Sequence, residues 1–399
     1  MVASIDLIKG TAIFNELKKI RENAAKCHEE PQIEEYAVDD VSGAFLDPKM
    51  VKKARTGEIE YVRTMKLYTK VPTRECLSIT GKQPIALRWI DVNKQVATNP
   101  LYRSRLVGKE FNTYNDMSLY AATPPIEALR LILHLAATNR ENGNFKIMTN
   151  DVSRAYFYAP VQEGQYIYVK LPPEDILPGE ENMCGRLHYS MYGTRRAATN
   201  WQTHYTKVLV QNGFVTGWAN NCTFYNKEKD IYCMVHGDDF VSTGKDSSLK
   251  WLESVLGKEF KIKTNMIGPD AKDEKELNIL DRIIRFTKNG IELEADLRHA
   301  ELIVSQLGLE NAKELTCPCA EEVKRDDDDK ELNSEYTTQY KSIVARANYL
   351  SKDRPDIQYT VKKLATSMSK PTNRNWQKPQ RLGRSLKGKP RFCLLYTSD

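Results

Sequence analysis

Two acidic side chains at a tight turn constrain this sequence more than any other feature. Residues 231–244 read as a strand, an acidic pair at a turn and a second strand, with Gly237 just before Asp238 and Asp239. This pattern predicts a β-hairpin with Asp238 and Asp239 at its tip. Adjacent carboxylates repel each other, so a rigid turn that carries both is suited to a cation of charge two or more. An ordinary polar turn is the alternative, since Asp and Gly are common turn residues.

The composition is that of a globular, intracellular protein. The chain has 399 residues, of which 41% are hydrophobic, so we expect a sizeable core and two or three subdomains. Its 59 basic and 53 acidic residues give a net charge of +6, which suggests a polyanionic partner without proving one. The eight cysteines form no C-x-x-C pair and are interpreted as free thiols. We find no signal peptide and no long apolar segment, so a membrane partner is not expected.

A second predicted hairpin carries cations. Residues 85–92 and 102–109 read as strands joined by a polar connection, and they contain Arg103, Arg105 and Lys109. Guanidinium groups match phosphate oxygens, so this hairpin is a candidate phosphate-binding element. A solvated strand face is the equally simple alternative.

A third carboxylate, Asp151, ends a predicted strand over residues 145–152. If this strand neighbours the acidic hairpin in one sheet, Asp151, Asp238 and Asp239 converge. Such a cluster can hold two divalent metals, about 3.5–4 Å apart, for phosphoryl transfer. Mg²⁺ is the expected ion because it prefers hard oxygen ligands, with Mn²⁺ as a substitute.

The remaining segments alternate between helical and extended patterns. A helix is predicted from Pro124 to about Asn139, and another within residues 187–212 that contains Trp201. Residues 277–286 predict one strand, with Asn289 and Gly290 as its turn. Residues 321–333 are predicted to be an acidic linker, and residues 370–391 hold eight basic side chains and no acidic one, which suits a phosphate backbone.

Six ordered segments resemble the reverse transcriptases of copia-type retrotransposon Pol polyproteins. The two acidic blocks are similar to the catalytic blocks of that family, and the others resemble its fingers strand, its nucleotide-binding block and its connection segment. The segments are residues 102–107, 151–157, 191–201, 235–239, 354–359 and 370–376.

The resemblance implies an α+β, right-hand polymerase fold with an antiparallel palm sheet, and RNA-directed DNA polymerase activity. It implies an RNA template, a DNA or RNA primer and deoxynucleoside triphosphates as partners, with a homodimer or other polyprotein segments as further ones. Asp151, Asp238 and Asp239 are the implied catalytic metal ligands. Tyr156 is the implied gate against the 2′-hydroxyl. The implied nucleotide-binding set is Tyr156, Ala155, Arg103, Arg105, Lys109 and Arg196.

The same resemblance divides the chain into five parts. These are a charged helical lead-in (1–59), a polymerase domain (60–320), the acidic linker (321–333), a helical, basic connection (334–391) and a tail outside the family (392–399). We expect a polyprotein piece that stops before ribonuclease H and acts in the cytoplasm, in the element's particle, or in the nucleus. His236, Gly237, Arg196 and Ala198 depart from the family pattern and leave the activity of this copy open. The alternatives are a decayed copy that only binds nucleic acid, an RNA-dependent RNA polymerase and, last, a metal-dependent nuclease.

Overall fold

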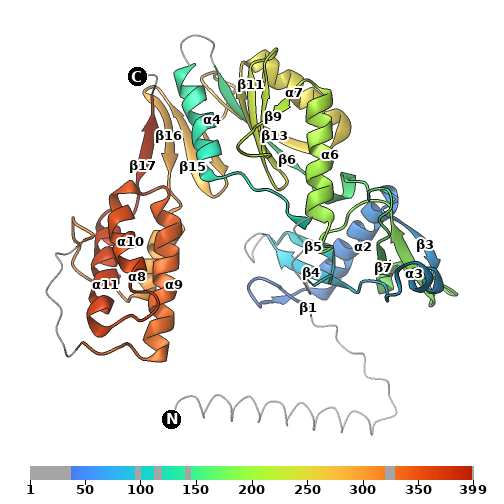
Figure 1. The fold of residues 1–399 in the computed structure, drawn as a ribbon, viewed down its shortest axis with the longest axis horizontal. Helices are drawn as coiled ribbons and strands as arrows, with labels where there is room; N and C mark the ends of the chain where they lie inside the picture. Colours follow the sequence, from blue (N-terminus) through green and yellow to red (C-terminus); the bar gives the residue numbers. More distant parts are fainter. Residues whose placement is uncertain (1–36, 95–99, 112–118, 140–144, 320–328, 398–399) are drawn as a thin grey trace, which may run out of the picture. The chain divides into compact units, whose positions relative to one another are not determined.

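The computed structural model describes residues 37–94, 100–111, 119–139, 145–319 and 329–397. These residues form two compact units (Figure 1). The first unit takes in the described residues between 37 and 110 with 166–188 and 192–194, and the second takes in the other described residues. No helix in the described segments is long and apolar enough to cross a membrane.

The first unit combines a three-stranded antiparallel sheet with a separate hairpin. The sheet has the order β3-β8-β7, and β4 pairs with β5. Helix α2 begins at Pro48 because the Asp47 side chain accepts hydrogen bonds from the Lys49 and Met50 backbone, and proline suits the first helical position. The pairing of β4 with β5 confirms the hairpin predicted over residues 85–109. The elements are β1 (Ala37–Val38), β2 (Phe45–Leu46), α2 (Pro48–Thr64), β3 (Tyr68–Pro72), α3 (Thr73–Thr80), β4 (Leu87–Asn93), β5 (Tyr102–Gly108), β7 (Tyr168–Lys170), η3 (Pro173–Asp175) and β8 (Met183–Leu187).

The second unit is organised around a six-stranded antiparallel sheet. Its order is β13-β6-β12-β11-β10-β9, so the acidic hairpin and the strand that ends in Asp151 are neighbours. The fold class predicted from the sequence, α+β with an antiparallel sheet, is confirmed. The strands are β6 (Lys146–Val152), β9 (Val215–Thr216), β10 (Thr223–Asn226), β11 (Ile231–His236), β12 (Asp239–Gly244) and β13 (Ile262–Ile267).

Both faces of this sheet are covered because its central strands are apolar on alternate sides. Met148 and Phe240 pack with helices α6 (Ala197–Gln211) and α7 (Asp246–Glu259). Ile147 and Val241 point the other way and pack with α4 (Ile126–Thr138). The helix predicted from Pro124 is thus confirmed. The single-turn helix η2 (Ala155–Tyr158) follows β6 directly.

A second, four-stranded sheet packs on the α4 side and leads into a helical bundle. The one strand predicted over residues 277–286 is wrong, because a tight turn at Leu280 and Asp281 divides it into two strands. The turn predicted at Asn289 and Gly290 is confirmed. The elements are β14 (Glu276–Ile279), β15 (Arg282–Thr287), β16 (Gly290–Glu294), α8 (Leu297–Gln306), α9 (Ser334–Ser351), η4 (Pro355–Ile357), α10 (Gln358–Ala365), α11 (Asn373–Gly388) and β17 (Cys393–Tyr396).

The predicted division into five parts remains a prediction. Helix α2 runs across the expected boundary between residues 59 and 60. Most of the lead-in and residues 321–328 of the acidic linker lie outside the described residues. In the predicted tail, β17 pairs with β16.

Candidate active site

Three aspartates lie at one end of the six-stranded sheet. Asp151 on β6 and Asp239 on β12 are direct cross-strand partners. Asp238 precedes Asp239 in the hairpin loop, and its carbonyl accepts a hydrogen bond of 3.0 Å from the Val152 N–H. The predicted neighbourhood of the two strands is confirmed. The oxygen atoms of the three aspartates do not all lie within 4.8 Å of one another, and their metal-binding role remains a prediction.

The turn that carries Asp238 is short and held from one side. Its two residues are Gly237 and Asp238, and Gly237 has a φ of +61°. A positive φ at the first loop residue suits a type II′ hairpin, which requires glycine there. The indole Nε1 of Trp201 on α6 donates a 2.9 Å hydrogen bond to the Gly237 carbonyl. Since Trp201 is buried in the core beneath the sheet, the turn is anchored to that core.

The electrostatics of the site are those of crowded negative charge. Burial raises the pKa of Asp239, and the charges of Asp151 and Asp238 raise it further, whereas His236 lowers it. A raised pKa means that the ionised carboxylate is unfavourable here without a cation.

A pocket of about 190 Å³ opens beside Asp151 and Asp239. Thr149 and Val241, from the same face of the sheet, line it together with Lys263, which is the cross-strand partner of Asp151 on β13. The opposite wall is formed by Asn278, Ile279 and Leu280 at the β14–β15 turn. The pocket thus joins the two sheets of the second unit.

The aromatic residue predicted as the sugar gate lies close to this site. Tyr156 lies in η2, partly buried against the core cluster that contains fully buried Ala155. Burial raises the pKa of the Tyr156 hydroxyl, and the charge of Asp238 raises it further. The phenol is therefore near enough to Asp238 to sense its charge, whereas its role as a gate is untested.

The other predicted binding residues lie elsewhere. Arg196 directly precedes α6 in the second unit and is half-buried. Arg103 and Arg105 on β5 and Lys109 just beyond it belong to the first unit and share one face by strand alternation. The Arg105 guanidinium lies 4.9 Å from the ring centre of Tyr192. The phosphate-binding role of these four cations remains a prediction.

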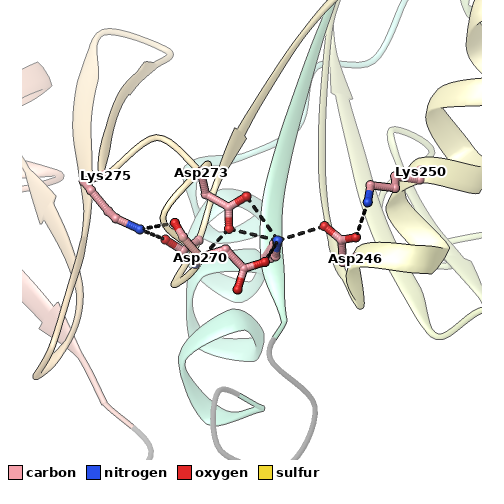
Figure 2. Close-up of polar contacts among 7 residues, drawn as sticks. Asp246, Lys250, Asp270, Asp273 and Lys275 are labelled. Atoms are coloured by element: carbon pink, nitrogen blue, oxygen red, sulfur yellow. Dashed lines mark hydrogen bonds and ion pairs between the residues drawn. The ribbon is translucent and has the colours of Figure 1, made fainter.

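A different group of three carboxylates surrounds a buried lysine. Oxygen atoms of Asp246, Asp270 and Asp273 all lie within 4.8 Å of one another, which is close enough to hold a metal ion. Their carboxylate oxygens lie 2.8, 2.6 and 2.9 Å from the Lys146 Nζ. Figure 2 shows the three labelled aspartates with dashed contacts to a shared nitrogen atom between them. Among the described residues it is this group that meets the distance, and the ammonium ion accounts for the close approach. The cluster is a structural ion-pair network with Lys146 at its centre.

Sequence reasoning missed several residues of the site. Lys263, Asn278 and Leu280 line the pocket but lie in β13 and at the β14–β15 turn. These stretches contain no motif that indicates a binding or catalytic site. The alternation of polar and apolar residues over 262–267 indicates only a strand. Their contribution depends on the packing of the second sheet.

Comparison with known proteins gives a consistent result. A family model described as "Reverse transcriptase (RNA-dependent DNA polymerase)" matches residues 77–320. The Retrovirus-related Pol polyprotein from transposon RE1 of Arabidopsis thaliana is 26% identical over 323 residues, which are 77% of this chain and 20% of that protein. The polyprotein from transposon TNT 1-94 of Nicotiana tabacum is 22% identical over 335 residues, 79% of this chain and 24% of that protein.

A yeast polyprotein and one solved structure are also similar to this chain. The Transposon Ty1-NL2 Gag-Pol polyprotein of Saccharomyces cerevisiae is 27% identical over 270 residues, 64% of this chain and 14% of that protein. A solved structure described as "foamy viral protease-reverse transcriptase dRH in complex with ds DNA" aligns with 85% of this chain and 48% of that one. Its TM-score is 0.44 and its identity is 10%. The chain spans between 14% and 24% of the length of these polyproteins.

Proposed function

This chain belongs to the reverse transcriptase (RNA-dependent DNA polymerase) family, as its copia-type resemblance predicted, and we propose on this premise that it copies RNA into DNA. Its partners would be an RNA template, a DNA or RNA primer and deoxynucleoside triphosphates. The observation that supports the proposal most directly is the pairing of Asp151 with Asp239 across two strands, with Asp238 next in the chain. A right-hand polymerase places its metal carboxylates on a hairpin and a neighbouring strand in this way.

The residues of the site have the chemistry of divalent-cation ligands, although their oxygen atoms do not all lie within 4.8 Å of one another. Asp151, Asp238 and Asp239 supply hard carboxylate oxygens, and the raised pKa of Asp239 reflects repulsion that a cation would relieve. We propose Mg²⁺ as the ion, with Mn²⁺ as a substitute. When bound, such ions lower the pKa of an attacking hydroxyl and neutralise charge on the phosphates.

The protein's own contribution is to orient these groups. The Trp201 bond to the Gly237 carbonyl fixes the turn, and the β6–β12 register fixes Asp151 opposite Asp239. Such preorganisation matters because nucleotidyl transfer depends on position and charge rather than on covalent chemistry by the protein. Tyr156 beside Asp238 would exclude a 2′-hydroxyl and so select deoxynucleotides over ribonucleotides.

The nucleotide's phosphates need cations as well. We propose that Arg196 and one or more of Arg103, Arg105 and Lys109 bind them, since guanidinium and ammonium groups suit phosphate oxygens. The contact of Arg105 with Tyr192 restricts its guanidinium more than an exposed strand position would.

Primer extension on an RNA template tests the proposal. Asp238→Asn should reduce DNA synthesis in Mg²⁺ to background while template binding stays within a few-fold, because the lost charge is needed for the metals. The matched control is Asp230→Asn, which changes an aspartate in the β10–β11 turn of the same sheet and should extend normally. Normal extension by Asp238→Asn would refute the metal assignment. Loss of folding by Asp238→Asn would indicate a structural role instead.

A further inference from the structure

The turn that forms one wall of the active-site pocket has an unusual backbone. Leu280 and Asp281 have φ values of +51° and +62°, and neither is glycine. Two left-handed residues in succession give a type I′ turn, which strongly prefers Asn-Gly or Asp-Gly. Non-glycine side chains make this conformation costly, so its neighbours must hold it in place. Ile279 and Leu280 line the pocket that also contains Asp151 and Asp239.

The Arg282 guanidinium binds the backbone of this turn through its Nη1 atom. Its Nη1 donates a 2.7 Å hydrogen bond to the Leu280 carbonyl, and its Nε donates a 2.7 Å hydrogen bond to Asp353 Oδ2. The Arg282 and Asp353 side chains are 7% and 3% exposed. A guanidinium is planar and rigid, so the bond from Nε to Asp353 also fixes where Nη1 lies. The position of the Leu280 carbonyl therefore depends on Asp353.

Asp353 is itself fixed by several elements. Its backbone N–H donates to the Leu350 carbonyl at the end of α9, which anchors it to the helical bundle. Its Oδ1 lies 3.5 Å from Nη2 of Arg130 on α4, and that guanidinium also bonds the Lys352 carbonyl. The carboxylate thus connects α4, β15 and the bundle.

We propose that Asp353 and Arg282 are positioning residues for nucleotidyl transfer, which hold the Leu280–Asp281 turn against the pocket of the catalytic carboxylates. This inference rests on the proposed function. Neither side chain lines the pocket. They act through the turn, so their loss should change catalysis without changing the ligands of the metals.

Asp353→Asn tests the inference by steady-state primer extension. Loss of a group that orients a metal ligand directly costs about 10–100-fold. Asp353 acts one step further away, through Arg282 and the turn, so we expect a loss in kcat at the lower end of this range, about 10-fold. The Kd for primer-template should change little, since no contact surface is removed. Asp281→Gly in the Asp353→Asn background should restore kcat several-fold, because glycine adopts the left-handed conformation without being held.

The matched control is Glu294→Gln on β16 of the same sheet. Glu294 is also a buried carboxylate, 1% exposed, and it is bound by Arg285 and Arg391. It makes no bond with the turn in the described contacts, so its loss should lower stability but leave kcat within about twofold. Equal losses in both variants, without rescue by Asp281→Gly, would mean general destabilisation and would overturn the inference.

Two further measurements keep the inference decidable. If Asp353→Asn does not fold, Arg282→Lys replaces it, because an ammonium on a flexible stem cannot hold both acceptors in one fixed plane. Wild-type kcat in a folded variant would overturn the inference. Hydrogen exchange of peptides covering residues 277–283 should rise in Asp353→Asn and not in Glu294→Gln. This exchange result tests whether Asp353 holds the turn without depending on primer extension, so a wild-type protein that extends no primer would be a failure of the proposed function alone.

Discussion

Lys146→Met should lower the free energy of unfolding by about 3 kcal/mol. The Lys146 ammonium lies within 2.9 Å of carboxylates from Asp246, Asp270 and Asp273. Methionine is similar in length but uncharged, so Asp273, whose side chain is 2% exposed, loses its cation. Removing one partner of a buried ion pair costs about 3–5 kcal/mol. The lower end applies because Asp246 and Asp270 are 31% and 48% exposed and can regain water.

Lys250→Met is the matched control for this prediction. Lys250 binds the same Asp246 at 2.5 Å, but its side chain is 54% exposed and the pair has helical spacing. Such pairs contribute about 0.3–0.5 kcal/mol. Urea unfolding followed by tryptophan fluorescence measures both, since Trp201 and Trp251 report on the core beside the sheet. A loss below about 1 kcal/mol in Lys146→Met, or an equal loss in both variants, would refute the reasoning.

The pKa shifts determine how the stability difference between the wild-type protein and Lys146→Met changes with pH. Hydrogen bonds from Lys146 and Lys250 lower the pKa of Asp246 to about 2, and the bond from Lys146 lowers the pKa of Asp270. Their contribution is complete above the ordinary aspartate pKa of about 4 and is lost as the pH falls further. Burial alone would lower the pKa of Lys146, but its hydrogen bonds to the three aspartates outweigh burial and raise it. The difference should therefore be constant from about pH 5 to about pH 10.

The same variant should acquire a response to divalent cations. In the wild-type protein the three carboxylates have oxygen atoms within 4.8 Å of one another around the ammonium group, and a divalent cation can take the place of that group between them. Millimolar Ca²⁺ should then raise the unfolding midpoint of Lys146→Met more than that of the wild-type protein. No difference in response would mean that the aspartates spread apart once the lysine is gone.

Three other substitutions have defined outcomes. Tyr156→Val should raise incorporation of ribonucleotides relative to deoxynucleotides in primer extension, and an unchanged ratio would place the gate elsewhere. Asp239→Asn should raise the unfolding midpoint of the metal-free protein at pH 7, because a carboxylate with a raised pKa destabilises the fold when it is ionised, and Mg²⁺ should remove the advantage; no rise would contradict this. Gly193→Ala should lower the free energy of unfolding far more than Gly237→Ala. Both glycines have a positive φ, but a Cβ at Gly193 would lie 2.1 Å from the Gly108 carbonyl oxygen, whereas a Cβ at Gly237 would meet no described atom within 4 Å. Equal losses in the two variants would contradict this.

The acidic hairpin was predictable because local signals agree there. Strand composition on both sides of Gly237 and a two-residue loop specify Asp238 and Asp239 at the tip. Asp151 could be placed at a strand end, but its register opposite Asp239 depends on tertiary pairing. From the sequence, the neighbourhood of the two strands was therefore predicted only as a condition, and the register comes from the structure.

The sequence failed where tertiary contacts override local preference. Leu280 and Asp281 carry no glycine to mark their turn, which persists because Arg282 and Asp353 hold it. Lys146 lies in a strand pattern that gives no sign of a buried charge, since its partners are about a hundred residues away or more.

The basic segment 370–391 shows a related effect. Arg381, Arg384 and Lys387 donate to backbone carbonyls of Cys319, Lys313 and Ala312. These cations stabilise the bundle, so a phosphate-binding role for the segment, which remains a prediction, would depend more on its other basic residues.

The most direct test of the central claim is incorporation of a single labelled deoxynucleotide by the purified wild-type chain on a DNA primer annealed to RNA. We expect incorporation in Mg²⁺ or Mn²⁺ that follows the template base and is lost with a chelator. Binding of the primer-template without incorporation in either metal would contradict the claim and would favour a decayed copy that only binds nucleic acid.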